Sequence, residues 1–250
     1  MHPRIPIKFN RIYFRMHRGA SLQVEFCNTV STALETEVYT PSNPSPLMSS
    51  VWTYIKSDYY RYAPFNGRSG TMARAMVFAK MLATAFLAKE QGFTYSFWFR
   101  LASQPNMLRP FARLKKWRLG KLYGIQIPNS TRIGYGLYLG HAVGMVVNGH
   151  TTIGNNCNLS HFLSIGTNHG TPARIGDNVY IGPNVCIVED VEIGDNATIG
   201  AGAVVTKSIP AMATAAGVPC KVISYDHPAR YIGNPWPHIP PKHQKHTAES

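Results

Sequence analysis

The hydrophobic pattern of the chain changes period at Gly124. Along residues 133–206 a bulky aliphatic residue returns every six positions, and a smaller apolar residue stands four positions after each of them. The regular aliphatic series is Ile175, Ile181, Ile187, Ile193, Ile199 and Val205, and the smaller residues are Cys157, Val179, Val185, Val191, Ala197 and Ala203. This repeat predicts a left-handed parallel β-helix, in which three short strands make one triangular coil and the aliphatic side chains stack inward at about 4.8 Å.

Polar residues of a particular kind stand where such a helix must turn. Asn155, Asn156, Asn178, Asn184 and Asn196 fall between the apolar positions. Asparagine tolerates the left-handed backbone that tight corners demand. We therefore expect these residues at the corners, with the repeat ending at Pro210 and a turn at residues 215–219 capping it.

Upstream of Gly124 the apolar spacing is helical. It predicts helices over residues 51–61, 71–91, 93–103 and 105–122, with Gly92 as the stop of the second. The apolar face expected for the second helix is Met72, Ala75, Met76, Ala79, Leu82, Ala83 and Phe86.

The predicted fold class is mainly β: a left-handed β-helix at residues 124–224, preceded by an α-helical domain at residues 48–123. Residues 225–250, rich in proline and histidine, are expected to be a flexible tail whose histidines are solvated. Residues 1–47 show no clean period, so we expect a loose or non-native extension, with Met48 as an alternative start.

Charge is spread unevenly over the 250 residues, whose net charge is +13. Residues 51–124 hold 13 lysines and arginines against Asp58 and Glu90. This basic half could meet a membrane surface or a phosphorylated substrate, or its cations could simply solvate the helices. We expect no nucleic-acid partner.

The four cysteines show no Cys-x-x-Cys pairing, so they favour neither a metal site nor a disulfide framework. No segment has the compact apolar stretch of a signal peptide or a membrane span. A cytoplasmic protein without a bound metal is therefore expected.

Two irregularities in the repeat carry histidines. Two extra residues fall within residues 139–147 and four fall between Ile165 and Ile175. His141 and His161 each lie two positions after a leucine, one coil apart, so they should share a corner, and His169 lies in the second irregularity. A corner histidine beside a cleft suits general-base catalysis. Exposed edges favour side-by-side packing of identical prisms, most simply as a trimer with a cleft between prisms.

Two motifs resemble bacterial serine O-acetyltransferases, which are acetyl-CoA-dependent members of the hexapeptide-repeat family. The first is the run from Leu139 to Val147, and the second extends from Ile199 through Val205 to the Ala-Ala-Gly-Val-Pro-Cys-Lys ending at Lys221. Upstream, Ile-Lys-Ser-Asp58 and Trp-Phe-Arg-Leu-Ala102 resemble elements of that family's helical domain. The resemblance covers residues 52–224.

The resemblance implies roles for particular residues. His141 matches the catalytic base that deprotonates the acceptor hydroxyl. The backbone of Gly182, Ala201 and Ala216 would contact the pantetheine arm of acetyl-CoA, and Lys221 and Lys207 would meet its phosphates. Gly202 and Gly217 belong to the same implied cofactor groove.

Four positions depart from the family pattern. Gly140 stands where the family has an aspartate beside the catalytic histidine. Gln126 stands where the family has a carboxylate that orients the catalytic histidine. Residues 168–172, with His169 and Thr171, form a shortened substrate loop. His161 replaces the glutamine usual in that branch and is similar to acetyltransferases of exopolysaccharide synthesis of the colanic acid type.

The acceptor is therefore L-serine, giving O-acetylserine for cysteine synthesis, or alternatively a sugar hydroxyl of an exopolysaccharide or capsule. Two further classes stay open. A zinc hydratase of the γ-carbonic-anhydrase type would use His141, His161 and His169 as ligands, and a non-catalytic scaffold would dock through the basic half. We expect a homotrimer, or a dimer of trimers joined through the helical domain.

Overall fold

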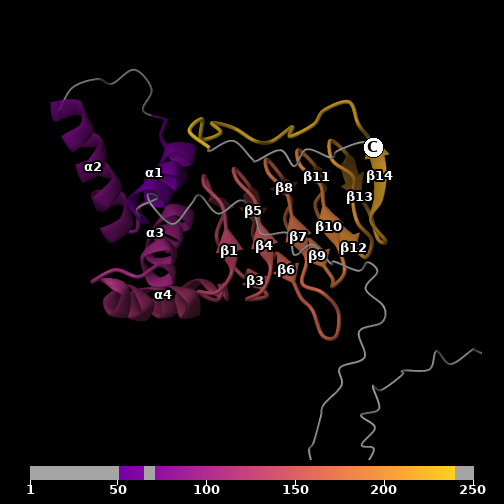
Figure 1. Cartoon of the computed structure of the whole chain (residues 1–250), viewed down its shortest axis with the longest axis horizontal. Coiled ribbons are helices and arrows are strands. Elements are labelled where there is room, and N and C mark those ends of the chain that lie inside the picture. Colours follow the sequence, from indigo (N-terminus) through magenta and orange to yellow (C-terminus); the bar gives the residue numbers. More distant parts are fainter. Residues whose placement is uncertain (1–50, 65–70, 240–250) are drawn as a thin grey trace, which may run out of the picture. The chain divides into compact units, whose positions relative to one another are not determined.

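The computed structural model describes residues 51–64 and 71–239, in which four helices precede fourteen short strands (Figure 1). The helices are α1 (Val51–Tyr62), α2 (Thr71–Phe86), α3 (Gln91–Ser103) and α4 (Arg109–Tyr123). Gly124 follows α4 in the left-handed conformation, with φ of 68°. The change of period at this residue is thus a change from helix to β-helix. The extension expected at residues 1–47 lies outside the described residues.

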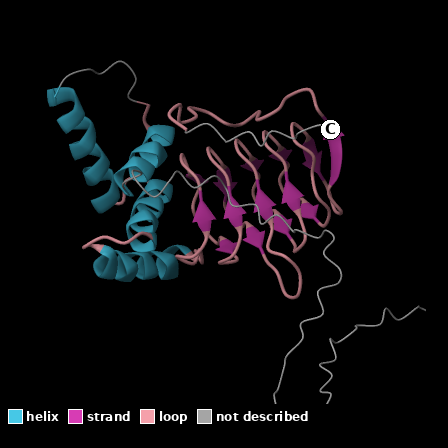
Figure 2. Ribbon diagram, in the orientation of Figure 1, coloured by secondary structure: helices cyan, strands magenta, loops and turns pink. Residues whose placement is uncertain are grey.

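The strands form three sheets, which are the faces of a triangular coil (Figure 2). The first face is β1-β4-β7-β10, the second is β2-β5-β8-β11-β13 with β14 at its end, and the third is β3-β6-β9-β12. All pairings within the faces are parallel except β13 with β14. The strands are β1 (Arg132–Ile133), β2 (Tyr138–Gly140), β3 (Val146–Val147), β4 (Thr152–Ile153), β5 (Asn158–Ser160), β6 (Ser164–Ile165), β7 (Arg174–Ile175), β8 (Tyr180–Ile181), β9 (Cys186–Ile187), β10 (Glu192–Ile193), β11 (Thr198–Ile199), β12 (Val204–Val205), β13 (Thr214–Ala216) and β14 (Lys221–Ser224).

The predicted inward positions are buried. Every residue of the regular aliphatic series and every smaller apolar residue predicted beside it belongs to one continuous core. Cys157 is one of them, and burial raises the pKa of its thiol to about 12, as expected for a core filler. Asn156, Asn178, Asn184 and Asn196 turn corners with φ between 54° and 61°. The predicted parallel β-helix is confirmed.

Pro210 does not end the repeat, contrary to the sequence prediction. Ile209 still pairs with Ile193, and β13 adds one more strand to the second face by pairing in parallel with β11. The chain then reverses at the predicted turn, and β14 pairs antiparallel with β13. Proline interrupts a strand locally, but the inward slots after it are filled by Ala213 and Ala215, which continue the core.

The second predicted helix was placed correctly, but its end and its buried face were wrong. It ends at Phe86, and Ala88 takes a left-handed conformation before α3 begins. Met81 and Ala85 are its buried residues, whereas Met72 is 80 % exposed. Because α2 is apolar almost all the way round, spacing alone could not select the face that packs.

Gly92 lies inside α3 and does not stop α2. A Cβ atom at this position would lie 2.1 Å from the Leu139 carbonyl oxygen and 2.5 Å from the Tyr62 hydroxyl. The missing side chain therefore lets α3 lie directly on β2. The Tyr62 hydroxyl accepts a bond from Leu139 N–H at 2.9 Å and donates to the Leu139 carbonyl at 3.2 Å, which completes this contact.

The substitution Gly92→Ala should lower the free energy of unfolding by about 1–3 kcal/mol, because helix and strand must separate to admit the methyl group. Chemical denaturation measures this. Gly166→Ala is the matched control, because a Cβ atom there meets nothing within 4 Å. Equal stability of the two variants would contradict the close approach.

A buried polar joint connects the helices to the first coil. Arg100 of α3 pairs with both carboxylate oxygens of Asp58 of α1, at 2.9 and 3.0 Å, and donates to the carbonyls of Ile133 and Gly134. Asp58 also accepts the N–H of Leu137 at 2.8 Å. Burial raises the pKa of Asp58, and the Arg100 guanidinium opposes that shift. The two motif residues that the resemblance had singled out upstream are thus partners.

The expectation of a flexible tail was wrong for much of the C-terminal segment. Residues 229–239 run back along the β-helix (Figure 1), where the buried Trp236 exchanges hydrogen bonds with Asn156. The Tyr231 carbonyl accepts from Asn158, and Arg61 donates to the Gly233 carbonyl. The segment has no regular secondary structure, so the hydrophobic period of the sequence could not predict its contact with the β-helix. Its histidines at 227 and 238 are exposed, as predicted.

No single helix within the described residues has both the length and the apolar character for a membrane span. Helices α2 and α3 reach that length and apolarity only together, and they are bent by 98° at their junction.

Candidate active site

The edge where the second and third faces meet brings the two predicted histidines together. We call it the histidine edge; it consists of the residues that follow β2, β5, β8, β11 and β13. Leu139 pairs with Leu159, so His141 and His161, two positions further on, stack on successive coils. Their rings lie 5.8 Å apart between centroids, at an interplanar angle of 81°. This confirms the prediction that they share a corner.

The two histidines differ in their surroundings. His141 is exposed, and its φ of 49° is unusual for a residue other than glycine or asparagine. The corner asparagines take the same conformation, so this angle marks a corner of the coil. His161 is partly covered, and its Nδ1 atom is buried without a hydrogen-bond partner among the described residues. An exposed imidazole beside a second one with an unused nitrogen can accept and hold a proton from a bound hydroxyl.

Sequence reasoning missed Phe162 at the same edge. It has a φ of 56°, is half exposed, and meets the His161 ring at 5.4 Å between centroids. Its ring fills the space beside Gly144, where a Cβ atom would lie 2.4 Å from it. The apolar ring next to two histidines was the available signal, but its position became meaningful only with the coil register.

The predicted cofactor residues line the same edge further along. Ile181, Ile199 and Ala215 are in register, so the residues that follow them, Gly182, Gly200 and Ala216, succeed one another toward the C-terminal end, and Ala201 lies one position after Gly200. Gly182 approaches the next coil so closely that a Cβ atom would lie 2.8 Å from Ala201 N. At Gly202, with φ of 69°, a Cβ atom would meet nothing within 4 Å, so the backbone there is open to a ligand.

The histidine edge has the length that an extended ligand needs. From the coil of His141 to that of Ala216 there are four steps, or roughly 19 Å at the usual strand spacing. Lys221 pairs with Ala216 in β14, and Gly217 lies at the turn between them. A cation therefore lies at the far end from the histidines, where the phosphates of a long cofactor would be.

The structure does not bring the other predicted residues to this edge. His169 and Thr171 lie in the loop between β6 and β7, which joins the third face to the first. Lys207 follows β12 and also lies between the third and first faces. The loop is held by Asp190, which accepts the Thr171 N–H at 2.7 Å, and by Glu189, which accepts the Asn168 N–H. Within one chain these residues therefore belong to a different edge.

Gln126 lies on the third face, one coil before β3. Its backbone pairs with Val146, and its side chain is exposed. Among the hydrogen bonds of the described residues none joins Gln126 to His141. The role predicted for this side chain, orienting the imidazole, stays a prediction.

The ligand set of the zinc alternative is not assembled within the chain. Over residues 51–64 and 71–239 no three side chains of histidine, cysteine, aspartate or glutamate lie close enough together to hold a metal ion. His141 and His161 are adjacent, but His169 lies at the other edge.

Comparison with known families agrees with this architecture. Residues 172–207 match the family described as bacterial transferase hexapeptide (six repeats). The matched residues lie within the β-helix. Serine acetyltransferase 4 of Arabidopsis thaliana is 34% identical over 112 residues, which are 43% of this chain and 32% of that protein. Serine acetyltransferase of Haemophilus influenzae is 34% identical over 115 residues, 43% of this chain and 42% of that protein.

The structural similarity reaches beyond the repeat. The soybean serine acetyltransferase apoenzyme superposes with a TM-score of 0.55 at 27% identity, over 70% of this chain and 69% of that one. The soybean enzyme complexed with serine gives a TM-score of 0.54 at 26% identity, over 70% of each chain. The structural match shows that the fold of the helices and the β-helix is shared. The sequence matches span less than half of the length of these curated relatives.

Proposed function

We propose that the protein is an acetyl-CoA-dependent O-acetyltransferase of the serine acetyltransferase type. The observation that carries this is the single edge on which His141, His161 and the open backbone from Gly182 to Gly217 are in register. The general base and the extended groove therefore form one continuous site. They follow one another along the edge in the order that the resemblance implies.

The reaction on this edge is a direct transfer. His141 removes the proton of the acceptor hydroxyl, whose oxygen attacks the thioester carbonyl of acetyl-CoA. The carbon–sulfur bond breaks, the acetyl group stays on the acceptor oxygen, and the CoA thiolate takes up a proton. The backbone at Ala201, Gly202 and Ala216 would hold the pantetheine arm, and Lys221 its phosphate end.

L-serine is the proposed acceptor, since the similar soybean enzyme has been solved in complex with serine. A sugar hydroxyl is the second candidate. His161 beside His141 and the short loop carrying His169 favour it, because both depart from the serine acetyltransferase pattern. Acetyl-CoA consumption with L-serine, homoserine and oligosaccharides as separate acceptors distinguishes the two, and no consumption with any of them would support a scaffold.

A homotrimer is proposed as the working assembly. His169, Thr171 and Lys207 lie at one edge of the prism and His141 at another, so one chain cannot bring them to a common site. Side-by-side packing of prisms around a threefold axis places unlike edges next to each other. The helical domain could join two such trimers, and its basic surface could contact a membrane.

Light scattering should therefore give a mass about three or six times the 27.7 kDa of one chain. The chain at micromolar concentration is the sample, and its activity is measured in the same buffer. A fully active monomer would contradict the shared site.

A further inference from the structure

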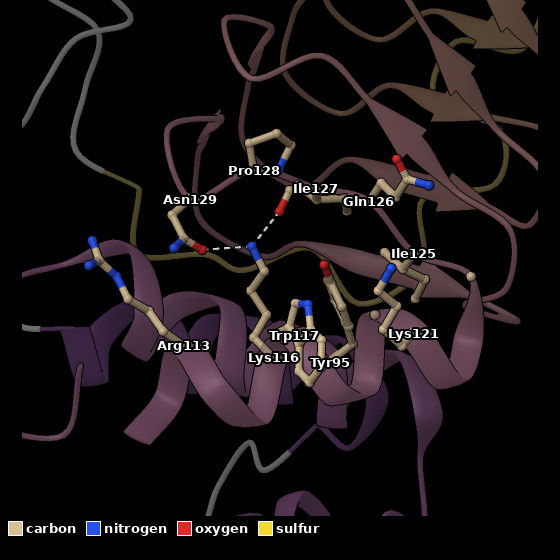
Figure 3. Close-up of a pocket in the computed structure, with 12 residues that line it drawn as sticks. Tyr95, Arg113, Lys116, Trp117, Lys121, Ile125, Gln126, Ile127, Pro128 and Asn129 are labelled. Atoms are coloured by element: carbon tan, nitrogen blue, oxygen red, sulfur yellow. Dashed lines mark hydrogen bonds between the residues drawn. The ribbon is translucent and has the colours of Figure 1, made fainter. Parts of the chain in front are cut away.

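A pocket of 660 Å³ lies between α4 and the segment that opens the β-helix, and it belongs to no part of the transferase edge described above (Figure 3). Its floor is one face of α4, and its opposite wall is residues 124–129. Its volume is in the range of small-molecule sites. None of its twelve lining residues is an aspartate or glutamate.

Three cations line this pocket along α4 without a carboxylate partner among the described residues (Figure 3). Arg113, Lys116 and Lys121 line it from α4, and α4 itself contains no acidic residue. In the described part of the chain none of the three forms an ion pair; the buried pair of Arg100 with Asp58 lies elsewhere. The described residues therefore leave the positive charge of the pocket uncompensated.

Lys116 is held in place and still has a free donor. Its ammonium group donates to the Ile127 carbonyl at 2.5 Å and to Asn129 Oδ1 at 2.6 Å (Figure 3). An ammonium group has three N–H donors, so one remains for a ligand. The two bonds fix the direction of the group, which reduces the entropy lost on binding.

A second group points to a ligand independently of the charges. Tyr95 is 1% exposed and lines the pocket, and its buried hydroxyl donates to no acceptor among the described residues. The Ile127 backbone beside it opposes the rise in the Tyr95 pKa that burial causes, and it leaves the O–H donor unused. A buried, unsatisfied hydroxyl costs about 1–3 kcal/mol, which a bound acceptor atom would recover. Gln126 adds a free amide to the same wall.

The pocket also has an apolar side. Trp117, Ile125 and Pro128 line it together with the cations, and Trp117 is 58% exposed at its rim. Aromatic faces of this kind suit the flat, apolar side of a compact organic body. A bare inorganic ion would leave this surface unused.

We propose that this pocket binds a small organic anion, a phosphate or carboxylate group carried on a body about the size of a sugar. The anionic group lies beside Lys116, with Arg113 and Lys121 on either side of it along α4, and it accepts from the Tyr95 hydroxyl. The body packs against Trp117. The binding does not require acetyl transfer, so it stands or falls apart from the proposed enzymatic function.

Calorimetry on the full chain without acetyl-CoA tests this directly. The probes are glucose 6-phosphate, glucuronate and inorganic phosphate, with neutral glucose as the control. Glucose 6-phosphate and glucuronate should bind saturably, and inorganic phosphate should bind more weakly. Comparing the two sugars shows whether the site prefers a phosphate or a carboxylate group. Equal binding of glucose, or no saturation by either anionic sugar in the millimolar range, would overturn the site.

Matched variants distinguish binding in this pocket from nonspecific attraction by the positive charge of α4. Arg113→Gln and Lys121→Gln should each weaken binding of the better anionic sugar about tenfold, the loss expected for one charge-assisted hydrogen bond. Lys115→Gln and Arg118→Gln remove the same charge from the same helix outside the pocket and should change it less than twofold. Equal losses in all four variants would overturn the proposal.

Tyr95→Phe supplies a readout that charge does not affect. Because the hydroxyl donates to no acceptor among the described residues, the variant should change the free energy of unfolding by less than about 1 kcal/mol while binding the anion about fivefold more weakly. Unchanged affinity would remove the hydroxyl from the site.

The pH dependence follows from Lys116. Burial and the neighbouring Arg113 lower the pKa of its amine to about 8. The other titratable groups that line the pocket are Arg113, Lys121 and Tyr95, and burial raises the pKa of Tyr95. Affinity should therefore fall as the pH rises from 7 to 9, and Lys116→Gln should flatten that fall; a fall of equal size in this variant would contradict the role of Lys116.

Discussion

Replacement of His141 by alanine is expected to lower the rate of acetyl transfer about 100- to 10,000-fold, the usual contribution of a general base. The fold should survive, because His141 is exposed and forms no hydrogen bond among the described residues. His141→Asn is the conservative variant, since asparagine accepts the left-handed backbone of this corner. Asn184 takes that conformation at the same edge, two coils further along. CoA release under saturating acetyl-CoA measures the rate.

His227 provides the matched control. It is exposed in the C-terminal segment, away from the histidine edge, so His227→Ala should retain activity within about twofold. Circular dichroism and light scattering on both variants confirm folding and assembly. Activity of His141→Ala and His141→Asn within a fewfold of the parent would refute the assignment of the base.

Asp58→Ala is expected to cost about 3–5 kcal/mol in the free energy of unfolding. The substitution leaves the Arg100 guanidinium buried without its partner, and breaking a buried pair from one side is strongly destabilising. It also leaves the Leu137 N–H without its acceptor, just before β2. Because β2 leads into His141, loss of activity should accompany the loss of stability.

Chemical denaturation at one fixed protein concentration measures the effect, since assembly contributes to apparent stability. Asp226→Ala is the control: its carboxylate is exposed and, among the described residues, bonds only Ser224, so a change within about 0.5 kcal/mol is expected. A loss below about 1 kcal/mol for Asp58→Ala would show that the joint is not required to hold the helices on the coil.

The repeat was predictable because its information is local. Each aliphatic residue of the hexads is inward for the same steric reason, and the asparagines turn corners through their own backbone preference. The pairing of His141 with His161 followed from counting residues per coil. The same count applied to β13 was obscured by Pro210, which suggested an end where the core continues.

Features that depend on distant contacts were not predictable. From the sequence alone, Gly92 was interpreted as a helix stop. A glycine is needed there because the carbonyl of Leu139 lies close to it, and Leu139 is 47 positions away in the sequence. The C-terminal segment has no period, yet Trp236 binds Asn156 across 80 positions. The assignment of His169 and Lys207 to another edge needed the three faces, and the pocket beside α4 needed the position of Tyr95 relative to a helix face.

The family resemblance pointed to individual residues but did not show which of them contact each other. Asp58 and Arg100 were singled out as family elements, but only the structure joins them. Conversely, Gln126 was singled out as a substituted catalytic position, and the structure places it on the third face, where it lines the pocket beside α4.

The most direct test of the central claim is the release of CoA from acetyl-CoA by the purified full chain, followed with and without L-serine and compared with His141→Ala. The account predicts acceptor-dependent release that the variant loses, with an O-acetylated product found by mass spectrometry. A second arm with oligosaccharide acceptors decides between the two acceptor classes. Binding of acetyl-CoA without release to any hydroxyl acceptor, or release that His141→Ala retains in full, would contradict it.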